Sequence, residues 1–500
     1  MQKNVLDYLY ETVKVKPDKV AFASDKESFT FSDVKHTSDK VGSYLAGRDI
    51  YKKPVIVFMR RAPREIVTFL GVIASGNFYV AIDEEMPASR IDLILKNTQS
   101  PLVICDEELI STARGFDFTG EIVSYDDVIK AEIDSSALAS IYEKQIDKDP
   151  IYIVFTSGST GVPKGVVGCH RAVIDYADAL SETLGFSEDT VFGSQAPLYF
   201  DACFKDVFPT LKFGATAYII PKPLFMTPIN LVEYLNEKKI NTLCWVVSAL
   251  TMISAFGTFK KIKPEYVHTI AFVGEVFPIK QFNRWKEAMP DTAFTNLYGP
   301  TEGTGVCCYY KVDRSFELDE VIPIGGPLCN TKLMLLKDRK ELAGDGETGE
   351  ICISGTSITL GYYNNPEKTA ESFIKNPLDD SEIIYCTGDI GKYNENGDLT
   401  FVSRQDFQIK HMGHRIELGE IEVNVNMVDE IKFSGCIYDK EKGKIVLFYV
   451  GDISEGDLTA ELRLKLPRYM LPNKIIKLSE MPLTPNGKTD RVALSKIYEG

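Results

Sequence analysis

The chain has 500 residues, of which 44% are hydrophobic and 25% are charged. These proportions are typical of a globular protein, exclude disorder as the main state and leave room for more than one domain. The net charge of -15 argues against a nucleic-acid-binding surface, because phosphate contacts need an excess of clustered Lys and Arg.

The first twenty residues, MQKNVLDYLYETVKVKPDKV, carry charges throughout and lack the apolar core of a signal peptide. The most apolar long stretch, residues 240–256, contains Asn241, Thr242 and further hydroxyls, and falls short of a spanning helix. We expect a buried strand followed by a core helix there. Together these features predict a cytoplasmic protein with no membrane insertion.

Cysteine and histidine spacing gives no metal-site pattern. The ten cysteines contain no C-x-x-C pair, which favours reduced core thiols over structural zinc. His411 and His414 are three residues apart without an accompanying carboxylate pattern, and we expect them in a solvated or loop position.

Residues 50–106 alternate strand-like runs (VIVF, YVAI, LVIC) with helix-like runs (PREIVTFLGVIASG, ASRIDLILKNT). Pro63 and Pro87 stand where helices begin. This alternation is typical of βαβ units with a parallel sheet.

The next segment, TSGSTGVPKG at 156–165, follows the apolar run IYIVF. Glycines are costly to order, so this loop predicts special backbone geometry or close approach of a ligand. Backbone N–H groups, hydroxyls and an ammonium form a donor-rich cradle for phosphate oxygens, made by Thr156, Ser157, Gly158, Ser159, Thr160, Gly161 and Lys164. Pro163 before Lys164 and Gly165 after it exclude the P-loop of the common nucleotidases.

Residues 216–299 repeat the α/β alternation, which predicts a second α/β layer. From about residue 321 the chain changes to short runs with many turns, which predicts a β-rich, barrel-like segment. The fold class is therefore α/β: two α/β subdomains and a distorted β-barrel in a large region at 1–405, then a small, mobile α+β region at 406–500 with a hinge at Asp406.

Five strings occur in an order that resembles the adenylate-forming superfamily of acyl-CoA synthetases, luciferases and peptide-synthetase adenylation domains. They are YIVFTSGSTGVPKGV, NLYGPTEG, YCTGDIG, RQDFQIKHMGHRIELGEIE and PNGKTDR, and they cover essentially the whole chain. YFDACF, LPRYMLP and GHRIELGEIE resemble the amino-acid adenylation branch, whereas FVGEVFP and DFQIK are most similar to D-alanine carrier-protein ligases.

The resemblance implies that ATP and an amino acid form aminoacyl-AMP and pyrophosphate, after which a phosphopantetheine thiol of a carrier protein takes the acyl group. No general base is needed, because the carboxylate is already ionised and is the nucleophile. Lys488 would bridge this carboxylate and the α-phosphate, Lys164, Thr156 and Thr160 would hold the outer phosphates, and Glu302 would hold Mg²⁺. Turning about Asp406 would withdraw Lys488 and bring Gly413 to a pantetheine tunnel.

The nucleotide's adenosine part would lie against a second group of residues. Tyr298 offers a ring for adenine, Asn296 an amide for the base edge, and Asp389 a carboxylate for the ribose hydroxyls. The resemblance implies that Arg404 also holds the ribose. It also implies that Gly299 and Thr301 of NLYGPTEG bind the nucleotide.

For the substrate, the resemblance implies that Asp201 pairs the α-ammonium, which favours an amino acid over acyl or aryl acids. The implied pocket consists of Asp201, Ala202, Lys205, Cys244, Ala271, Val273, Gly274, Leu297, Gly305, Val306 and Lys488. If Lys205 points into it, the substrate side chain is anionic or bears acceptors; if outward, a small neutral amino acid fits. D-alanine ligases have no lysine at this position and a cysteine in place of Val273, so chirality and side chain both stay open.

Several alternatives also stay open. The chain could be an acyl- or aryl-CoA synthetase, or a non-catalytic nucleotide-binding relative, although Lys164, Glu302, Asp389 and Lys488 argue against the latter. It could be a stand-alone ligase or a module of a larger synthetase, and its thiol acceptor could be carrier-protein pantetheine or free CoA. We expect a monomer.

Overall fold

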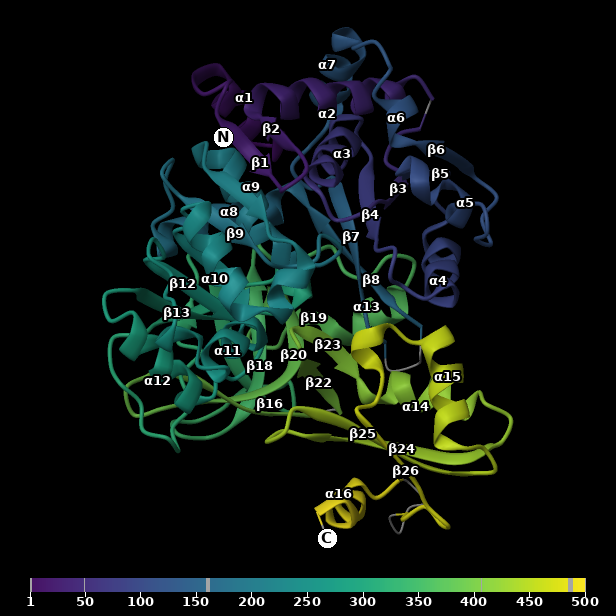
Figure 1. The fold of residues 1–500 in the computed structure, drawn as a ribbon, viewed down its shortest axis with the longest axis vertical. Helices are drawn as coiled ribbons and strands as arrows, with labels where there is room; N and C mark the ends of the chain where they lie inside the picture. Colours follow the sequence, from purple (N-terminus) through teal and green to yellow (C-terminus); the bar gives the residue numbers. More distant parts are fainter. Residues whose placement is uncertain (1, 49, 159–161, 406, 484–488, 500) are drawn as a thin grey trace.

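The computed structural model describes residues 2–48, 50–158, 162–405, 407–483 and 489–499. It has the α/β architecture expected from the sequence (Figure 1): two sheets flanked by helices, an antiparallel sheet that follows them in the chain, and a C-terminal part with its own strands and helices.

The first sheet has the strand order β6-β5-β3-β4-β7-β8, with β8 antiparallel to β7 and the remaining neighbours parallel. The predicted βαβ units at 50–106 are confirmed: α3 starts at Pro63, whose fixed φ suits a first helical position. The elements are β3 (Pro54–Phe58), α3 (Pro63–Ala74), β4 (Phe78–Ile82), α4 (Ala88–Thr98), β5 (Leu102–Cys105), α5 (Ile110–Ala113), β6 (Glu121–Ser124), α6 (Tyr125–Val128), α7 (Ser135–Lys144), β7 (Pro150–Thr156) and β8 (Lys164–Cys169), with α2 (Phe31–Ala46) packed on α3.

The second sheet has the order β15-β14-β13-β12-β11-β9-β10-β1-β2, and its strands from β13 to β1 are parallel. Residues 240–256 form a strand and a helix, β11 and α11, as predicted. The elements are α1 (Leu6–Val15), β1 (Val20–Ala23), β2 (Ser28–Thr30), α8 (His170–Leu184), β9 (Val191–Ser194), α9 (Phe204–Phe213), β10 (Thr216–Ile219), α10 (Pro228–Glu237), β11 (Thr242–Val246), α11 (Val247–Ala255), β12 (Thr269–Val273), α12 (Ile279–Ala288), β13 (Ala293–Tyr298), β14 (Cys308–Lys311) and β15 (Gly326–Pro327).

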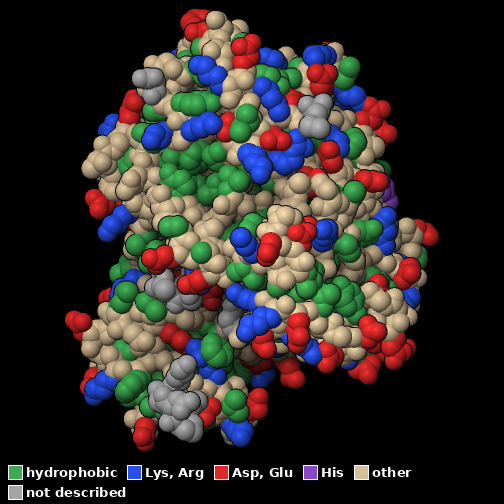
Figure 2. Space-filling model, turned by 180° about the vertical axis from the view of Figure 1, so that it is seen from behind, with side chains coloured by type: hydrophobic (Ala, Val, Ile, Leu, Met, Phe, Trp, Pro, Cys, Tyr) green, Lys and Arg blue, Asp and Glu red, His purple; other side chains and the backbone are tan. Residues whose placement is uncertain are grey.

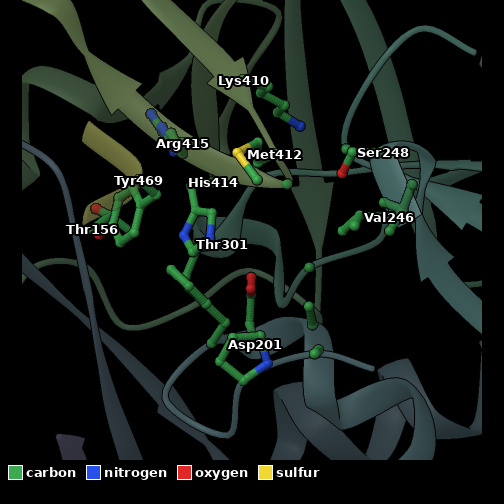
Figure 3. A pocket seen from close by; sticks show the side chains of 18 of the residues that line it. Thr156, Asp201, Val246, Ser248, Thr301, Lys410, Met412, His414, Arg415 and Tyr469 are labelled. Carbon is green, nitrogen blue, oxygen red and sulfur yellow. The ribbon is translucent and has the colours of Figure 1, made fainter. Parts of the chain in front are cut away.

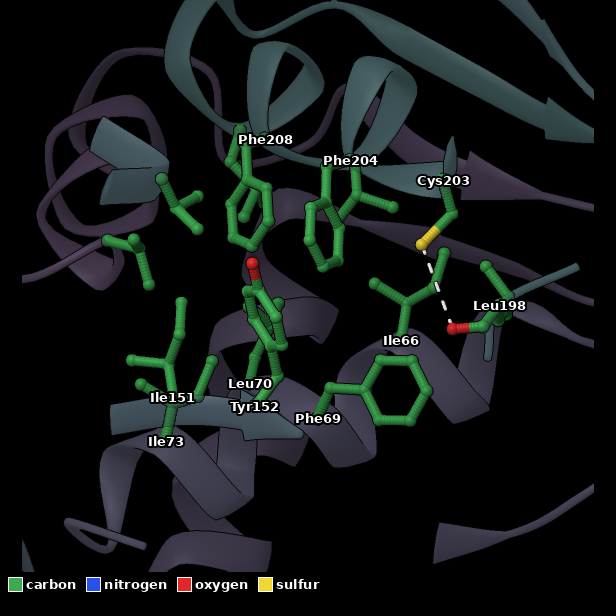
Figure 4. Packing of buried hydrophobic residues seen from close by; sticks show 14 of the residues in the cluster. Ile66, Phe69, Leu70, Ile73, Ile151, Tyr152, Leu198, Cys203, Phe204 and Phe208 are labelled. Atoms are coloured by element: carbon green, nitrogen blue, oxygen red, sulfur yellow. Dashed lines mark hydrogen bonds between the residues drawn. The ribbon is translucent and has the colours of Figure 1, made fainter. Parts of the chain in front are cut away.

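A continuous apolar core joins the two α/β units (Figure 4). Phe204 and Phe208 of α9 face Tyr152 of β7, and the Phe204 and Tyr152 ring centroids are 4.7 Å apart. Ile66 and Leu70 of α3 belong to the same cluster. Burying side chains of this size contributes about 1.5–3 kcal/mol each. This packing holds the start of α9 in place, and α9 follows directly on the 3-10 turn Asp201–Cys203.

The predicted β-rich segment forms a six-stranded sheet in which β16, β18, β20 and β19 pair in order and β21 pairs with β20. The elements are β16 (Thr331–Lys337), β17 (Glu341–Leu342), β18 (Gly349–Gly355), α13 (Pro366–Ser372), β19 (Phe373–Asn376), β20 (Asp379–Tyr393) and β21 (Leu399–Arg404).

The C-terminal part lies at the bottom of Figure 1 and has its own hydrophobic cluster. A hairpin precedes a three-stranded sheet of order β24-β25-β26. The elements are β22 (Gln408–His411), β23 (His414–Glu417), α14 (Leu418–Asn426), β24 (Ile431–Asp439), β25 (Lys444–Gly451), α15 (Glu455–Lys465), β26 (Lys474–Lys477) and α16 (Arg491–Glu499).

The expectation for the two histidines is wrong. His411 ends β22 and is buried, and His414 begins β23 and stacks on Tyr469 with ring centroids 3.7 Å apart. Each of them belongs to the hairpin, which packs against the rest of the molecule, and neither is a solvated loop residue.

None of the helices in the described ranges combines the length and hydropathy needed to cross a bilayer. Viewed from behind in Figure 2, basic and acidic side chains are interspersed over the surface, and the C-terminal part forms a lobe below the rest.

Candidate active site

A cavity of about 490 Å³ lies where the carboxyl ends of strands in both α/β units meet the C-terminal hairpin (Figure 3). Thr156 ends β7, Val246 ends β11, and Met412 and Gly413 form the turn between β22 and β23. Carboxyl ends of parallel strands are the usual ligand sites of open α/β sheets, because side chains from neighbouring loops converge there.

Thirteen residues predicted for the site line this cavity. They are Thr156, Ser157, Asp201, Ala202, Lys205, Val273, Gly274, Gly299, Thr301, Gly305, Asp389, Arg404 and Gly413. The structure thus brings the predicted nucleotide and substrate residues to one place, although they are distributed over more than 250 positions of the chain.

Other predicted residues lie outside this lining. They are Gly158, Lys164, Asn296, Tyr298, Glu302, Cys244, Ala271, Leu297 and Val306. The last four belong to the hydrophobic core cluster, together with the lining residue Val273. Ser159, Thr160, Gly161, Asp406 and Lys488 lie outside the described residues.

Glu302 is fully buried in a 3-10 turn, Thr301–Gly303, that follows β13. One of its carboxylate oxygens accepts from the Tyr362 hydroxyl at 2.6 Å and the other from Arg415 Nη1 at 2.7 Å. Burial raises the pKa of Glu302, but Arg415, Tyr362 and Lys164 outweigh this effect and hold the pKa at about 2. The carboxylate is therefore ionised at neutral pH, and it forms an ion pair with the Arg415 guanidinium of the β22–β23 hairpin.

The glycine-rich loop also contacts the C-terminal part. The Gly158 N–H donates to Glu420 Oε2 at 3.1 Å, and Glu420 Oε1 accepts from Arg90 at 2.6 Å. Lys164 Nζ lies 3.7 Å from Glu417 Oε1. Carboxylates from β23 and α14 thus contact the donors that the sequence assigns to phosphate oxygens.

Around Asp389, three groups meet in hydrogen-bond contact. The Tyr298 hydroxyl and Arg404 Nη1 each donate to its carboxylate at 2.5 Å. The amide of Asn296 instead donates to the Pro323 carbonyl at 2.8 Å. Asp389 and Arg404 line the cavity, whereas Tyr298 belongs to a core cluster beside it.

Asp201 precedes α9 and points into the cavity near Thr301 (Figure 3). Burial raises the pKa of Asp201, and Lys205 opposes the shift. Lys205, in the first turn of α9, also lines the cavity although its side chain is 2% exposed. The lysine thus faces the pocket rather than solvent.

Sequence reasoning missed several residues at this cavity. Arg415, His414 and Lys410 line it, and each stands within a quoted motif without an assigned role. Glu275, from the quoted FVGEVFP, accepts from the backbone N–H groups of Ser248 at 3.0 Å and Gly413 at 3.2 Å. Their presence in the quoted motifs was the available sequence signal. The motifs do not indicate which residue each side chain contacts.

Within the described ranges, Glu350, Cys352 and Cys386 are the group whose ligand atoms are close enough to hold a metal ion. The Glu350 oxygens already accept from Arg339 and the Gly388 N–H. Because the carboxylate is occupied, this cluster offers two thiols rather than a complete site. All ten cysteines are free; nine are buried, as predicted for core residues, whereas Cys329 is exposed.

Comparison with known proteins identifies a family and several similar proteins. Residues 9–363 match the model of the AMP-binding enzyme family. The chain is 30% identical to tyrocidine synthase 1 of Brevibacillus parabrevis over 98% of its own length, but it spans only 45% of that protein. It is also 30% identical to a D-alanine–D-alanyl carrier protein ligase of Bacillus cereus, with 96% of both chains covered.

Among solved structures, a nonribosomal peptide synthetase protein with adenylation and PCP domains superposes with a TM-score of 0.85. The match covers 99% of this chain and 84% of that one at 22% identity. At this identity the likeness establishes the fold.

Proposed function

Since the chain belongs to the AMP-binding enzyme family, we propose that it activates an amino-acid carboxylate with ATP and transfers the aminoacyl group to a carrier-protein thiol. One observation carries this proposal. Asp201, a carboxylate suited to an α-ammonium, opens into the same cavity as Thr156, Thr301, Asp389 and Arg404. An acyl- or aryl-acid substrate would offer no ammonium group to Asp201.

In the first half-reaction, the substrate carboxylate attacks the α-phosphorus and pyrophosphate leaves. Asp201 would fix the α-ammonium, and Asp389 with Arg404 would hold the ribose. Lys488 would bridge the carboxylate and the α-phosphate. The chain's contribution is alignment and charge stabilisation, with no proton transfer at the attacking oxygen.

Glu302 is the proposed Mg²⁺ ligand. Its ionised carboxylate fits a cation that binds few protein carboxylates together with phosphate oxygens. The fit requires Arg415 to withdraw, because that guanidinium now occupies one carboxylate oxygen. When bound, the cation would neutralise the phosphates.

In the second half-reaction, the thiol attacks the aminoacyl carbonyl and AMP leaves. We assign the described arrangement to this step, since Gly413 lies at the cavity and contacts Glu275. The C-terminal part, residues 406–500, would turn about Asp406 between the two steps. Ten free thiols support the cytoplasm as the compartment, and a monomer stays the expected state.

The test separates the two half-reactions. Lys488→Met should lower amino-acid-dependent ATP–pyrophosphate exchange by at least about 100-fold, because it removes a charge that acts on the developing α-phosphate. Thiol transfer from supplied aminoacyl-AMP should continue. The exposed Lys496→Met is the matched control. Equal loss of both half-reactions would reject the assigned role, and absence of exchange with every amino acid would reject the function.

A further inference from the structure

Lys205 is an unusual residue for its place. It lies in the first turn of α9, is 2% exposed and lines the cavity together with the apolar Val273. The amino terminus of a helix carries positive partial charge, so a buried ammonium there is unfavourable unless an anion accompanies it.

Among the described residues, Lys205 has no ion pair, although the buried Asp201 and Asp206 lie near enough to interact with it electrostatically. Lys205 Nζ makes one hydrogen bond, to the Ala202 carbonyl at 2.8 Å, although an ammonium has three donors. In the described ranges no carboxylate oxygen lies within 4.0 Å of it. Two N–H donors are thus left without a protein partner at a residue that lines the cavity.

Asp201 does not supply the missing partner in the loaded enzyme. Under the proposed function, its carboxylate is taken by the substrate's α-ammonium. A substrate with an uncharged side chain would then leave Lys205 buried with no carboxylate in hydrogen-bond contact. A side-chain carboxylate would accept from Lys205 and would also lie near the amino terminus of α9, so that charges alternate from Asp201 through the substrate to Lys205.

We infer that this enzyme selects an amino acid with a side-chain carboxylate, and that Lys205 is the residue that reads it. This inference rests on the proposed function and names its substrate class. Both enantiomers of aspartate and glutamate carry the required side-chain carboxylate.

The experiment is ATP–pyrophosphate exchange with L- and D-aspartate and glutamate, their amides, alanine and 2-aminobutyrate. Wild type should prefer an acidic amino acid over its amide by at least about 100-fold in kcat/KM, because a site built for a polar group rejects analogues that leave it unpaired. Lys205→Met should abolish that preference.

Lys212→Met is the matched control, since Lys212 lies on the same helix, outside the cavity lining, and contacts Asp178. It should keep the wild-type preference. A thermal melt with ATP verifies that each variant is folded. If Lys205→Met does not fold, the wild-type panel still decides the substrate class.

The outcomes separate the two proposals. Preference of the wild type for alanine or another uncharged amino acid, or survival of the acidic preference in Lys205→Met, would overturn the role of Lys205 and leave amino-acid activation intact. Failure to exchange with any amino acid would overturn the proposed function, and this inference with it.

Discussion

At the scale of single residues, we expect a buried carboxyl group beside Lys205 to make the folding stability depend on pH. Asp206 is 1% exposed, and burial raises its pKa to about 7 although Lys205 and Arg61 oppose the shift. An unfolded aspartate titrates near pH about 3.9, so between these values the folded state holds a proton that the unfolded state has lost. The stability due to this proton is complete below about pH 4 and is lost as the pH rises through 7.

Asp206→Asn should remove this dependence, because the amide imitates the protonated acid at every pH. Between pH 5 and pH 8, wild type should lose about 3 kcal/mol of unfolding free energy that the variant keeps. Urea unfolding at both pH values measures it. The exposed Asp18→Asn is the control; a difference that stays constant with pH would show that Asp206 is ionised in the folded protein.

At the scale of elements, the β22–β23 hairpin is placed by its turn. Gly413 has φ +79°, and a Cβ there would lie 2.6 Å from Val246 Cγ1. Only glycine combines this backbone conformation with so close an approach. Glu275 then joins the Gly413 N–H to the Ser248 N–H at the start of α11.

Glu275→Ala should weaken this docking and slow thioester formation by about 10–100-fold, which corresponds to losing hydrogen bonds to a charged acceptor. ATP–pyrophosphate exchange should stay within about twofold, because the contact belongs to the described arrangement, which we assign to the thiol-transfer step. Both rates are compared with those of Glu287→Ala, an exposed position on α12. Parallel loss of both rates would instead assign Glu275 a structural role.

At the scale of the whole molecule, the proposed function implies that the described arrangement and an ATP-bound one would compete for the same groups. Arg415 contacts the carboxylate proposed for Mg²⁺, while Glu420 and Glu417 approach Gly158 and Lys164 of the proposed phosphate loop. Bound Mg²⁺ and phosphates would therefore displace the hairpin and α14. Pyrophosphate release would allow them to return.

A cross-link between α4 and α15 tests this competition, since Ser89 Oγ donates to the Leu464 carbonyl at 3.1 Å. In a Cys329→Ser background, which removes the one exposed cysteine, Ser89→Cys with Leu464→Cys should cross-link at least about 10-fold more slowly with MgATP. The cross-linked protein should lose pyrophosphate exchange but retain thiol transfer. Cross-linking that is indifferent to MgATP would show that both arrangements share this contact.

Local sequence determined most of the elements and the chemical inventory of the site. Strand and helix periodicities at 50–106 and 216–299 predicted the two α/β units, because alternation of apolar and polar residues reflects which face is buried. The loop at 156–165 and Asp201 were recognisable from residue types and motif order.

The tertiary structure decided which groups meet. Arg415 and Glu302 are 113 residues apart in sequence, and Glu420 and Gly158 are 262 apart, so no local pattern encodes either contact. The direction of Lys205 depended on how α9 packs against Tyr152 and α3, since a lysine one position after a core phenylalanine can face solvent or a cavity. Local propensity determines the elements, whereas burial and charge pairing between distant segments determine the site.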